Sequence, residues 1–309
     1  MVCLTVDVSK NRKTEICNIC GGNVFAPLAR RSDDIEILLC QKCGMGALEV
    51  FPFDPMIIYN GNYYDNCGID VDAGYSDYDV SSEHGVLWAA ELVKIIRHDG
   101  RVLDIGCANG FLLKALGDGY EISGIEVNES AAERARVGGV RIIGNDIFER
   151  DLFPKYAGYF DAITAIAVFE HVTDFRKAIE VSLQMLKPDG VLIFEVPLVS
   201  EFNSNFTWFN TSLEHLYYPT TRSIKYLFGE ELNIPMVGGE LIIRDYASTF
   251  IGIVTPCAAS ACRIKKLYNR IMFEEPSKLP KDERRVQLLL KVIHAADAKP
   301  EHIPFVPEL

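Results

Sequence analysis

Four cysteines near the N-terminus form two closely spaced pairs. Cys17 and Cys20 are separated by two residues, as are Cys40 and Cys43, and nineteen residues lie between the pairs. This doubled spacing is typical of a four-thiolate zinc site, and four thiolates leave the metal no open position, which predicts a structural Zn²⁺. Four unrelated buried cysteines would have no reason to adopt the spacing, and a redox motif needs only one pair. We therefore expect a small N-terminal lobe that depends on the metal to fold.

A second chemical signal is a glycine-containing turn in the middle of the chain. The apolar run Val102–Ile105 leads into small residues between Gly106 and Gly110, and a helical pattern follows over 111–116. Such a pattern indicates a buried parallel strand that feeds a ligand-binding turn. Because glycine adopts positive φ without steric cost, the backbone and the amides of the next helix can approach a phosphate or cofactor closely.

Polar residues end each of the next predicted strands. Glu126 ends the run 120–127, about twenty residues after the turn, a spacing at which a carboxylate can accept hydrogen bonds from both ribose hydroxyls of a nucleoside. The runs 140–147 and 160–166 likewise end in or near polar residues, and predicted helices separate the strands. Strands that alternate with helices indicate a mainly parallel α/β sheet with helices on both faces, whose ligands bind at the carboxyl ends of the strands.

These motifs, in this order, resemble the class I S-adenosylmethionine-dependent methyltransferases. The resemblance covers about residues 82–255 and rests on Asp104-x-Gly106-x-Ala108-x-Gly110, Glu126, Asn145-Asp146, Glu170-His171-Val172 and the turn Leu186-Lys187-Pro188-Asp189-Gly190 before the fifth strand. It implies a doubly wound, mostly parallel seven-stranded sheet, whose last two strands, near 241–244 and 250–254, form an antiparallel edge. A nicotinamide-dinucleotide dehydrogenase would share the turn and the distal acid but not the later motifs.

The same resemblance implies where S-adenosylmethionine would bind. The turn from Gly106 to Gly110 would carry the methionine part, Glu126 the ribose hydroxyls, and Asp146 with the Ile147 amide the adenine. The residues expected to contact the cofactor are Asp104, Gly106, Cys107, Ala108, Asn109, Gly110, Glu126, Val127, Asn145, Asp146, Ile147, Ala165 and Val168.

A narrower resemblance is carried by the segment Glu214-His215-Leu216-Tyr217-Tyr218-Pro219 together with the cysteine lobe. This combination looks like methyltransferases that act on sugars and nucleotide-sugars in glycan or secondary-metabolite biosynthesis, and it implies His215 as the general base, with His171 close by. Histidine suits that role because its pKa lies near neutrality. Glu214 and Tyr217 complete the expected catalytic group. The alternatives are a loop histidine bonded to backbone, a His171 that only closes the cofactor pocket, and a Tyr217 that only packs.

Composition narrows the range of partners. The chain has 309 residues and a formal net charge of −12, which disfavours binding to a nucleic-acid backbone and favours a small-molecule acceptor. We find no secretory signal and no apolar run near the ~20 residues that span a bilayer, and we expect a soluble, cytoplasmic enzyme with no membrane partner. A zinc-ribbon RNA methyltransferase and a non-catalytic S-adenosylmethionine-binding module are the rival functions. Oligomeric state is left open.

The chain divides into four predicted parts. Residues 1–50 form the zinc-binding lobe, 51–81 a connector, 82–255 the methyltransferase core and 256–309 a helical tail. The connector is rich in tyrosines, Tyr59 among them, and can serve either as a cover over a polar ligand or as a linker that packs on the core. The tail is expected to dock back on the core.

Overall fold

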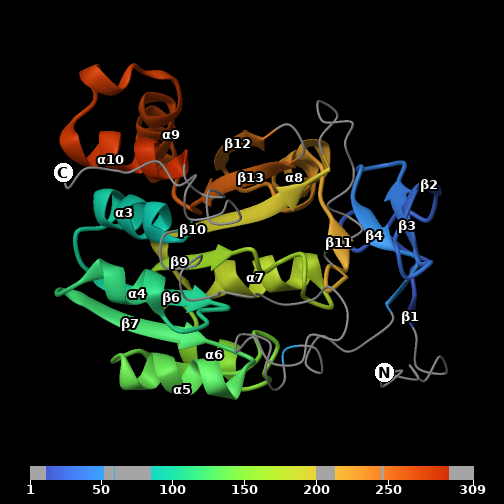
Figure 1. The fold of residues 1–309 in the computed structure, drawn as a ribbon, viewed down its shortest axis with the longest axis horizontal. Helices are drawn as coiled ribbons and strands as arrows, with labels where there is room; N and C mark the ends of the chain where they lie inside the picture. The colour runs from blue at the N-terminus through green and yellow to red at the C-terminus, as the bar shows by residue number, and fades with distance from the viewer. Residues whose placement is uncertain (1–11, 52–58, 60–84, 200–212, 245–246, 292–309) are drawn as a thin grey trace.

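The computed structural model describes residues 12–51, 59, 85–199, 213–244 and 247–291 (Figure 1). Its centre is a seven-stranded sheet in the order β12-β13-β10-β9-β6-β7-β8. The five strands from β10 to β8 are parallel, whereas β13 runs antiparallel to β10 and β12 antiparallel to β13. The predicted fold class is therefore confirmed. The strands are β6 (Gly100–Ile105), β7 (Tyr120–Ile125), β8 (Arg141–Gly144), β9 (Phe160–Ile166), β10 (Leu186–Leu198), β12 (Met236–Arg244) and β13 (Ala247–Val254).

Helices cover both faces of this sheet, because its strands are apolar on both sides. In β10, Leu192 and Phe194 belong to one core and Val191 and Ile193 to the other. On the first face lie α6 (Leu152–Tyr156), α7 (Phe175–Met185) and α8 (Thr221–Tyr226), the last continued by the π-helix η3 (Leu227–Glu231). On the second lie α3 (Leu87–Ile96), α4 (Phe111–Leu116), α5 (Glu129–Val137), α9 (Ala258–Phe273) and α10 (Lys281–Leu290), with the 3₁₀ turn η4 (Pro276–Lys278) between the last two.

The start of β10 differs from the sequence-based expectation. Residues 187–190 were expected to form a turn before the strand, but β10 already begins at Leu186, which pairs with Phe160. The register then shifts before Val191, so the turn-forming residues are accommodated as an irregularity within the strand. Most of the predicted connector and the end of the predicted tail lie outside the described residues. No helix in the described ranges is both long and apolar enough to cross a bilayer.

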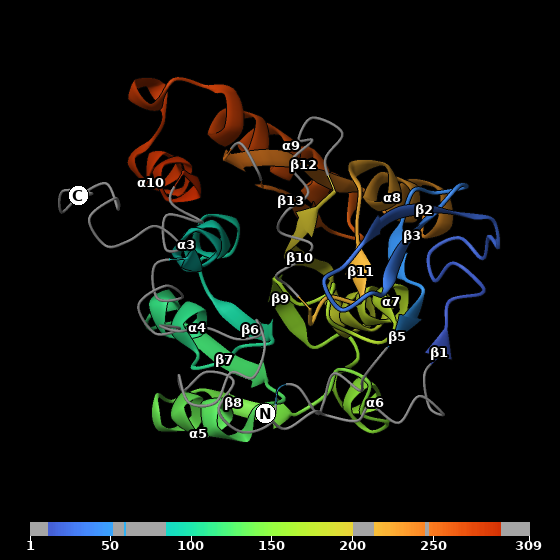
Figure 2. The ribbon, with the colours of Figure 1, turned by 45° about the vertical axis from the view of Figure 1, so that its right-hand side comes forward.

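The N-terminal lobe is built around a four-stranded sheet in the order β11-β4-β3-β2. Three strands come from the N-terminal residues, β2 (Phe25–Arg30), β3 (Glu36–Cys40) and β4 (Gly46–Leu48), and a small pair, β1 (Arg12–Lys13) and β5 (Val50–Phe51), lies beside them. The fourth strand, β11 (Tyr217–Tyr218), belongs to the segment that connects β10 with β12 of the central sheet (Figure 2). The lobe and the core thus share a strand that begins two residues after His215.

Candidate functional site

The turn after β6 and the acid after β7 meet at one edge of the sheet. Gly106 (φ 69°), Ala108 (φ 44°) and Gly110 (φ 76°) all take positive φ. A side chain at Gly106 would lie 2.6 Å from Val168, so only glycine lets the two approach. The Glu126 carboxylate accepts hydrogen bonds from the Ala108 amide (2.7 Å) and the Asn128 amide (2.8 Å). The hydrogen bond from Ala108 therefore joins Glu126, which follows β7, to the glycine turn.

Two buried carboxyls, those of Asp104 and Glu126, lie at this turn. Burial raises the pKa of Asp104 to about 7, although the Thr164 hydroxyl donates to it at 2.6 Å. Burial also raises the pKa of Glu126 to about 6, against the hydrogen bonds from the neighbouring amides. A nearby positive charge would favour the ionised forms and recover part of this desolvation cost. The sulfonium of S-adenosylmethionine carries such a charge, so the residues of the turn fit that cofactor.

Replacing Asp104 with asparagine is expected to stabilise the ligand-free protein at neutral pH. The raised pKa means that the neutral Asp104 carboxyl stabilises the wild type at low pH. This contribution to the free energy of unfolding is lost as pH rises from 3.8, the pKa in the unfolded chain, through about 7, the pKa in the folded protein. The variant should gain about 1.4 kcal/mol per pH unit across that window and reach a plateau above it. Asparagine can still accept from Thr164. Urea unfolding at a series of pH values measures the difference.

Asp161 provides the matched control for this experiment. Burial alone would raise its pKa, but the Arg101 amide and the Lys187 ammonium, 2.7 Å away, lower it overall. Its contribution to stability is therefore present above pH 3.8 and lost as pH falls, so Asp161→Asn should destabilise at pH 7. Parallel pH profiles for wild type and Asp104→Asn would contradict the assignment for Asp104.

The remaining residues predicted to hold the cofactor surround this turn or end the adjacent strand β8. Cys107, Asn109, Ile147 and Ala165 are buried, and Val127 is half-buried. At the end of β8 the Asn145 and Asp146 amides donate to the Glu149 carboxylate, at 2.6 and 3.2 Å. The Asp146 carboxylate accepts from the Phe148 amide at 3.0 Å. These groups are thus engaged within the protein, and an adenine there would share or replace those bonds.

A cluster of acid and imidazole groups lies next along the same edge. The His171 and His215 rings are 4.6 Å apart, and Glu170 Oε1 is 3.5 Å from His171 Nε2. One ligand atom from each of the three side chains lies within 4.8 Å of the others, close enough to hold a cation between them. Glu170 is fully buried, and neither of its carboxyl oxygens makes a hydrogen bond to any described residue. Glu170 was not among the predicted site residues, although its place beside His171 was a usable signal.

Burial controls the protonation of this cluster. It lowers the pKa of His171 to about 4 and that of His215 well below its usual value, the latter with further lowering by His171 and Arg31. It raises the pKa of Glu214 to about 7 and that of Glu170 well above its usual value. At neutral pH both imidazoles are therefore uncharged, and each becomes a stronger base only when a nearby negative charge stabilises its protonated form.

Tyr59 connects the region of Glu126, the acid held on the glycine turn, with the histidine pair. Its carbonyl accepts from the Asn128 side chain at 2.7 Å, two residues after Glu126, and its hydroxyl lies 2.7 Å from His171 Nδ1. Val168, which contacts Gly106, is three residues before His171. The glycine turn, Gly106 to Gly110, and the histidine pair therefore belong to one continuous region at the carboxyl ends of β6, β7 and β9.

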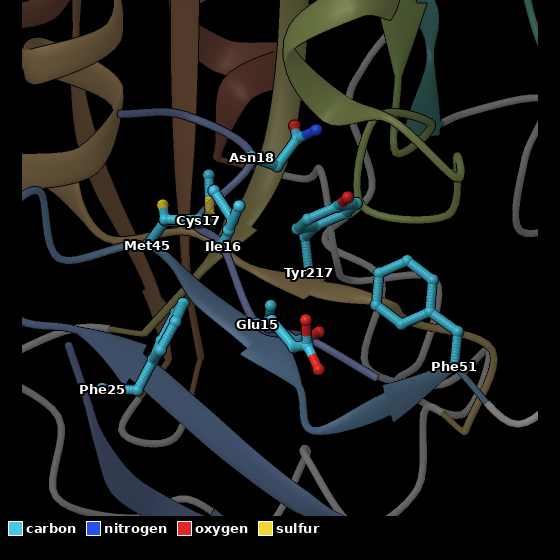
Figure 3. Close-up of a pocket in the computed structure, with 10 residues that line it drawn as sticks. Glu15, Ile16, Cys17, Asn18, Phe25, Met45, Phe51 and Tyr217 are labelled. Atoms are coloured by element: carbon cyan, nitrogen blue, oxygen red, sulfur yellow. The ribbon is translucent and has the colours of Figure 1, made fainter. Parts of the chain in front are cut away.

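Tyr217 lies differently from the two histidines. Its hydroxyl donates to the Thr173 carbonyl at 3.2 Å, and its ring packs edge-on against Phe51 and Phe175. Tyr217 and Phe51 line a cavity of about 320 Å³, together with Glu15 and Cys17 (Figure 3). Cys17 belongs to the first cysteine pair, and neither His171 nor His215 lines this cavity. Tyr217 thus connects the lobe cavity with the segment that carries His215.

The four N-terminal cysteines come together as a buried cluster. Cys17 Sγ lies 3.5 Å from Cys43 Sγ, and Cys20 Sγ lies 3.5 Å from Cys40 Sγ. Disulfide sulfurs would be about 2.05 Å apart, whereas sulfurs at 2.3 Å from a tetrahedral Zn²⁺ lie roughly 3.8 Å from one another. The residues after each pair, Gly21 and Gly44, have positive φ, and their amides donate to the Cys17 and Cys40 carbonyls. Four sulfurs on two tight turns fit a four-coordinate metal.

The glycine turn, the acid of β7 and the mostly parallel sheet with an antiparallel edge define the α/β methyltransferase fold of class I. Residues 86–233 match a family model described as a methyltransferase domain. This central region, slightly less than half of the chain, is therefore similar to known methyltransferase domains.

Several named relatives match part of the chain. Ubiquinone biosynthesis O-methyltransferase of Bordetella avium is 30% identical over 112 residues, which are 35% of this chain and 46% of the relative. The enzyme of the same name from Aromatoleum aromaticum is 31% identical over 111 residues, 34% and 45% of the two chains. The chain spans less than half the length of these curated relatives.

Solved structures match the chain at low sequence identity and with TM-scores below 0.5. A SAM-dependent methyltransferase from Archaeoglobus fulgidus has a TM-score of 0.45 and 14% identity, over 57% of this chain and 96% of that one. An O-methyltransferase family protein from Burkholderia thailandensis has a TM-score of 0.44 and 13% identity, over 57% of each chain.

Proposed function

We propose that the protein transfers the methyl group of S-adenosylmethionine to a small-molecule acceptor, with His215 as the general base. Methyl transfer from a sulfonium is an in-line displacement, so the protein mainly places the acceptor against the methyl carbon and excludes water. In the proposed reaction a nucleophilic oxygen or carbon of the acceptor forms the new bond to the methyl group as the bond to sulfur breaks. His215 takes the proton that the acceptor loses, and the uncharged sulfide product leaves.

One observation carries this proposal. The cofactor turn and the neutral histidine pair lie at the same edge of the sheet, joined by Tyr59, which contacts Asn128 at one end and His171 at the other. A base positioned beside a cationic cofactor needs to be uncharged and dry, and burial gives His215 both properties. The His171 ring lies 4.6 Å from the His215 ring and so adjoins the proposed base.

The acceptor is proposed to be a sugar or nucleotide-sugar, in glycan or secondary-metabolite biosynthesis. Support for it comes from the segment Glu214 to Pro219 and the cysteine lobe, the features that resemble sugar methyltransferases. The names of the relatives favour a second candidate, O-methylation of a ubiquinone precursor. Both acceptors lose a proton to a base, so both are compatible with His215.

We also propose that Cys17, Cys20, Cys40 and Cys43 bind one structural Zn²⁺. Support comes from the buried sulfurs, with one ligand atom of each within 4.8 Å of the others. When bound, the metal would cross-link two turns of a lobe whose own strands are short. All four positions are protein ligands, so the metal supplies structure and takes no part in methyl transfer.

His215→Asn tests the base. We expect calorimetric titration with S-adenosylmethionine to give an affinity within about twofold of wild type, because His215 is outside the cofactor turn. Transfer of labelled methyl to the acceptor should fall about 10² to 10⁴-fold, the usual contribution of a positioned base. The substrates are a panel of nucleotide-sugars and ubiquinone-type phenols, with His98→Asn, on the surface after α3, as control. Equal transfer by His215→Asn and wild type would remove His215 from the mechanism.

The same measurements separate the rival functions. A non-catalytic binding module predicts no labelled product with any acceptor although the cofactor binds. An RNA methyltransferase predicts labelled RNA, and a gel shift at low salt, despite the net charge of −12. Absence of any heat on titration with S-adenosylmethionine would contradict the whole proposal.

A further inference from the structure

The segment that carries His215 is held largely by the N-terminal lobe. Tyr217 and Tyr218 form β11, which pairs with Ala47 and Gly46 of β4. The Leu48 amide donates to the Leu216 carbonyl at 3.1 Å. A side chain at Gly46 would lie 2.7 Å from the Tyr218 carbonyl, so the two strands are in close contact. The lobe thus fixes the chain directly after the proposed base.

Arg31 of the lobe also contacts the residue that is the proposed base, His215. It follows β2, and its side chain is fully buried. One guanidinium nitrogen donates to the Leu213 carbonyl (3.0 Å) and to the His215 carbonyl (3.0 Å). The same nitrogen lies 3.1 Å from the Tyr218 hydroxyl, which itself donates to the His215 carbonyl at 3.3 Å. A single side chain of the lobe therefore binds the main chain on both sides of the His215 side chain.

The other edge of the Arg31 guanidinium is bound to Asp33, within the lobe. Arg31 Nε donates to Asp33 Oδ1 at 3.0 Å, and a second guanidinium nitrogen pairs with Asp33 Oδ2. Such a bidentate pair orients the planar group, so its remaining donors point in a set direction. The orientation is produced inside the lobe, and the group held in place is the proposed base. On the core side, the Leu216 and Tyr217 amides donate to the Glu170 carbonyl.

We propose that Arg31 is a positioning residue for His215, so that the N-terminal lobe is a component of the acceptor site. This inference rests on the proposed role of His215. Arg31 does not contact the reacting atoms; it fixes the carbonyl of the residue whose imidazole acts. Because a misplacement of about 1 Å can cost roughly 10²-fold in rate, loosening this carbonyl should impair methyl transfer while leaving the cofactor turn, on another part of the sheet edge, unaffected.

The test compares Arg31→Ala with Arg30→Ala. Arg30 is the preceding residue and pairs with Glu36, and more than half of its side chain is exposed, so it controls for loss of charge at this end of β2. We expect Arg31→Ala to lower kcat for methyl transfer about 10²-fold, with KM for S-adenosylmethionine and metal content unchanged. Arg30→Ala should leave all three unchanged.

A double-mutant cycle distinguishes positioning from general stabilisation. If Arg31 acts through His215, adding Arg31→Ala to His215→Asn should cause no further loss of rate, whereas independent effects would multiply. Multiplying effects would overturn the proposal. Arg31→Lys keeps the charge, but one ammonium cannot reproduce the set of guanidinium bonds, so it should restore folding and only part of the rate. This variant keeps the test valid if Arg31→Ala folds poorly.

Hydrogen exchange gives a readout that needs no acceptor. Amide exchange over residues 213–218 should accelerate at least about tenfold in Arg31→Ala and not in Arg30→Ala, since exchange reports local opening. Unchanged exchange would contradict the positioning role. If exchange accelerates but His215→Asn retains full activity, the proposed function has failed and the contact between the lobe and residues 213–218 stands; the two failures are thus distinguishable.

Discussion

Replacement of Glu126 with alanine is expected to abolish measurable cofactor binding at micromolar concentrations. The carboxylate is 2% exposed and already orders two backbone amides, those of Ala108 and Asn128. Each of its oxygens has a further lone pair with which to accept from a ribose hydroxyl. Hydrogen bonds to a charged group contribute about 1.5–3 kcal/mol each, so the loss of two should weaken binding of the demethylated cofactor product by at least about 10²-fold.

Glu126→Gln makes the test specific for the charge. Glutamine has the same shape, but only one of its two end groups accepts hydrogen bonds, so one of the two amides would face a donor. Calorimetry with the demethylated product should therefore show a loss close to that of alanine. Glu129→Ala, three residues on and pairing with Arg136 at the surface, is the control. Wild-type affinity in either Glu126 variant would remove this residue from the cofactor site.

Cys40→Ser is expected to cause the largest loss of structure. Cys40 is fully buried and ends β3, the strand that pairs with both β2 and β4. Structural zinc sites of this kind contribute about 10–16 kcal/mol of apparent binding free energy, and that free energy is coupled to folding. We expect bound zinc, measured by mass spectrometry, to fall from one ion per chain to less than a tenth, and protease cleavage within residues 12–51 to become rapid.

Because β11 belongs to the sheet of the lobe and begins two residues after His215, this substitution should also disturb the position of the proposed base. Methyl transfer is expected to disappear while the central sheet retains its circular dichroism and its affinity for S-adenosylmethionine. Cys262→Ser changes an exposed cysteine on α9 and is the matched control. A zinc content of one per chain in Cys40→Ser would contradict the four-thiolate site. Unchanged methyl transfer together with loss of zinc would contradict the coupling of lobe and core.

The central fold was predictable because its signals are local. An apolar run, a turn with glycine at positive φ and a helix with period 3.6 are each written within about ten residues, and their order selects a parallel sheet. The structure bears out the strand that leads into Gly106 and the antiparallel edge of β12 and β13. Element ends were less predictable: β10 begins five residues early because pairing with Phe160, a tertiary contact, overrides the turn propensity of 187–190.

The sequence by itself determined the sheet, the glycine turn, the acid that follows it and the doubled cysteine spacing. Only the tertiary structure decided that Tyr217 and Tyr218 complete the sheet of the lobe and that Arg31 binds the His215 carbonyl from 184 residues away. It also decided that Glu170 is buried without a hydrogen-bond partner for its carboxyl among the described residues. The physical reason is the range of each interaction. Periodicity and turn chemistry act between neighbours in sequence, whereas a guanidinium reaching a distant carbonyl, or a carboxyl losing its water, depends on packing that no local pattern encodes.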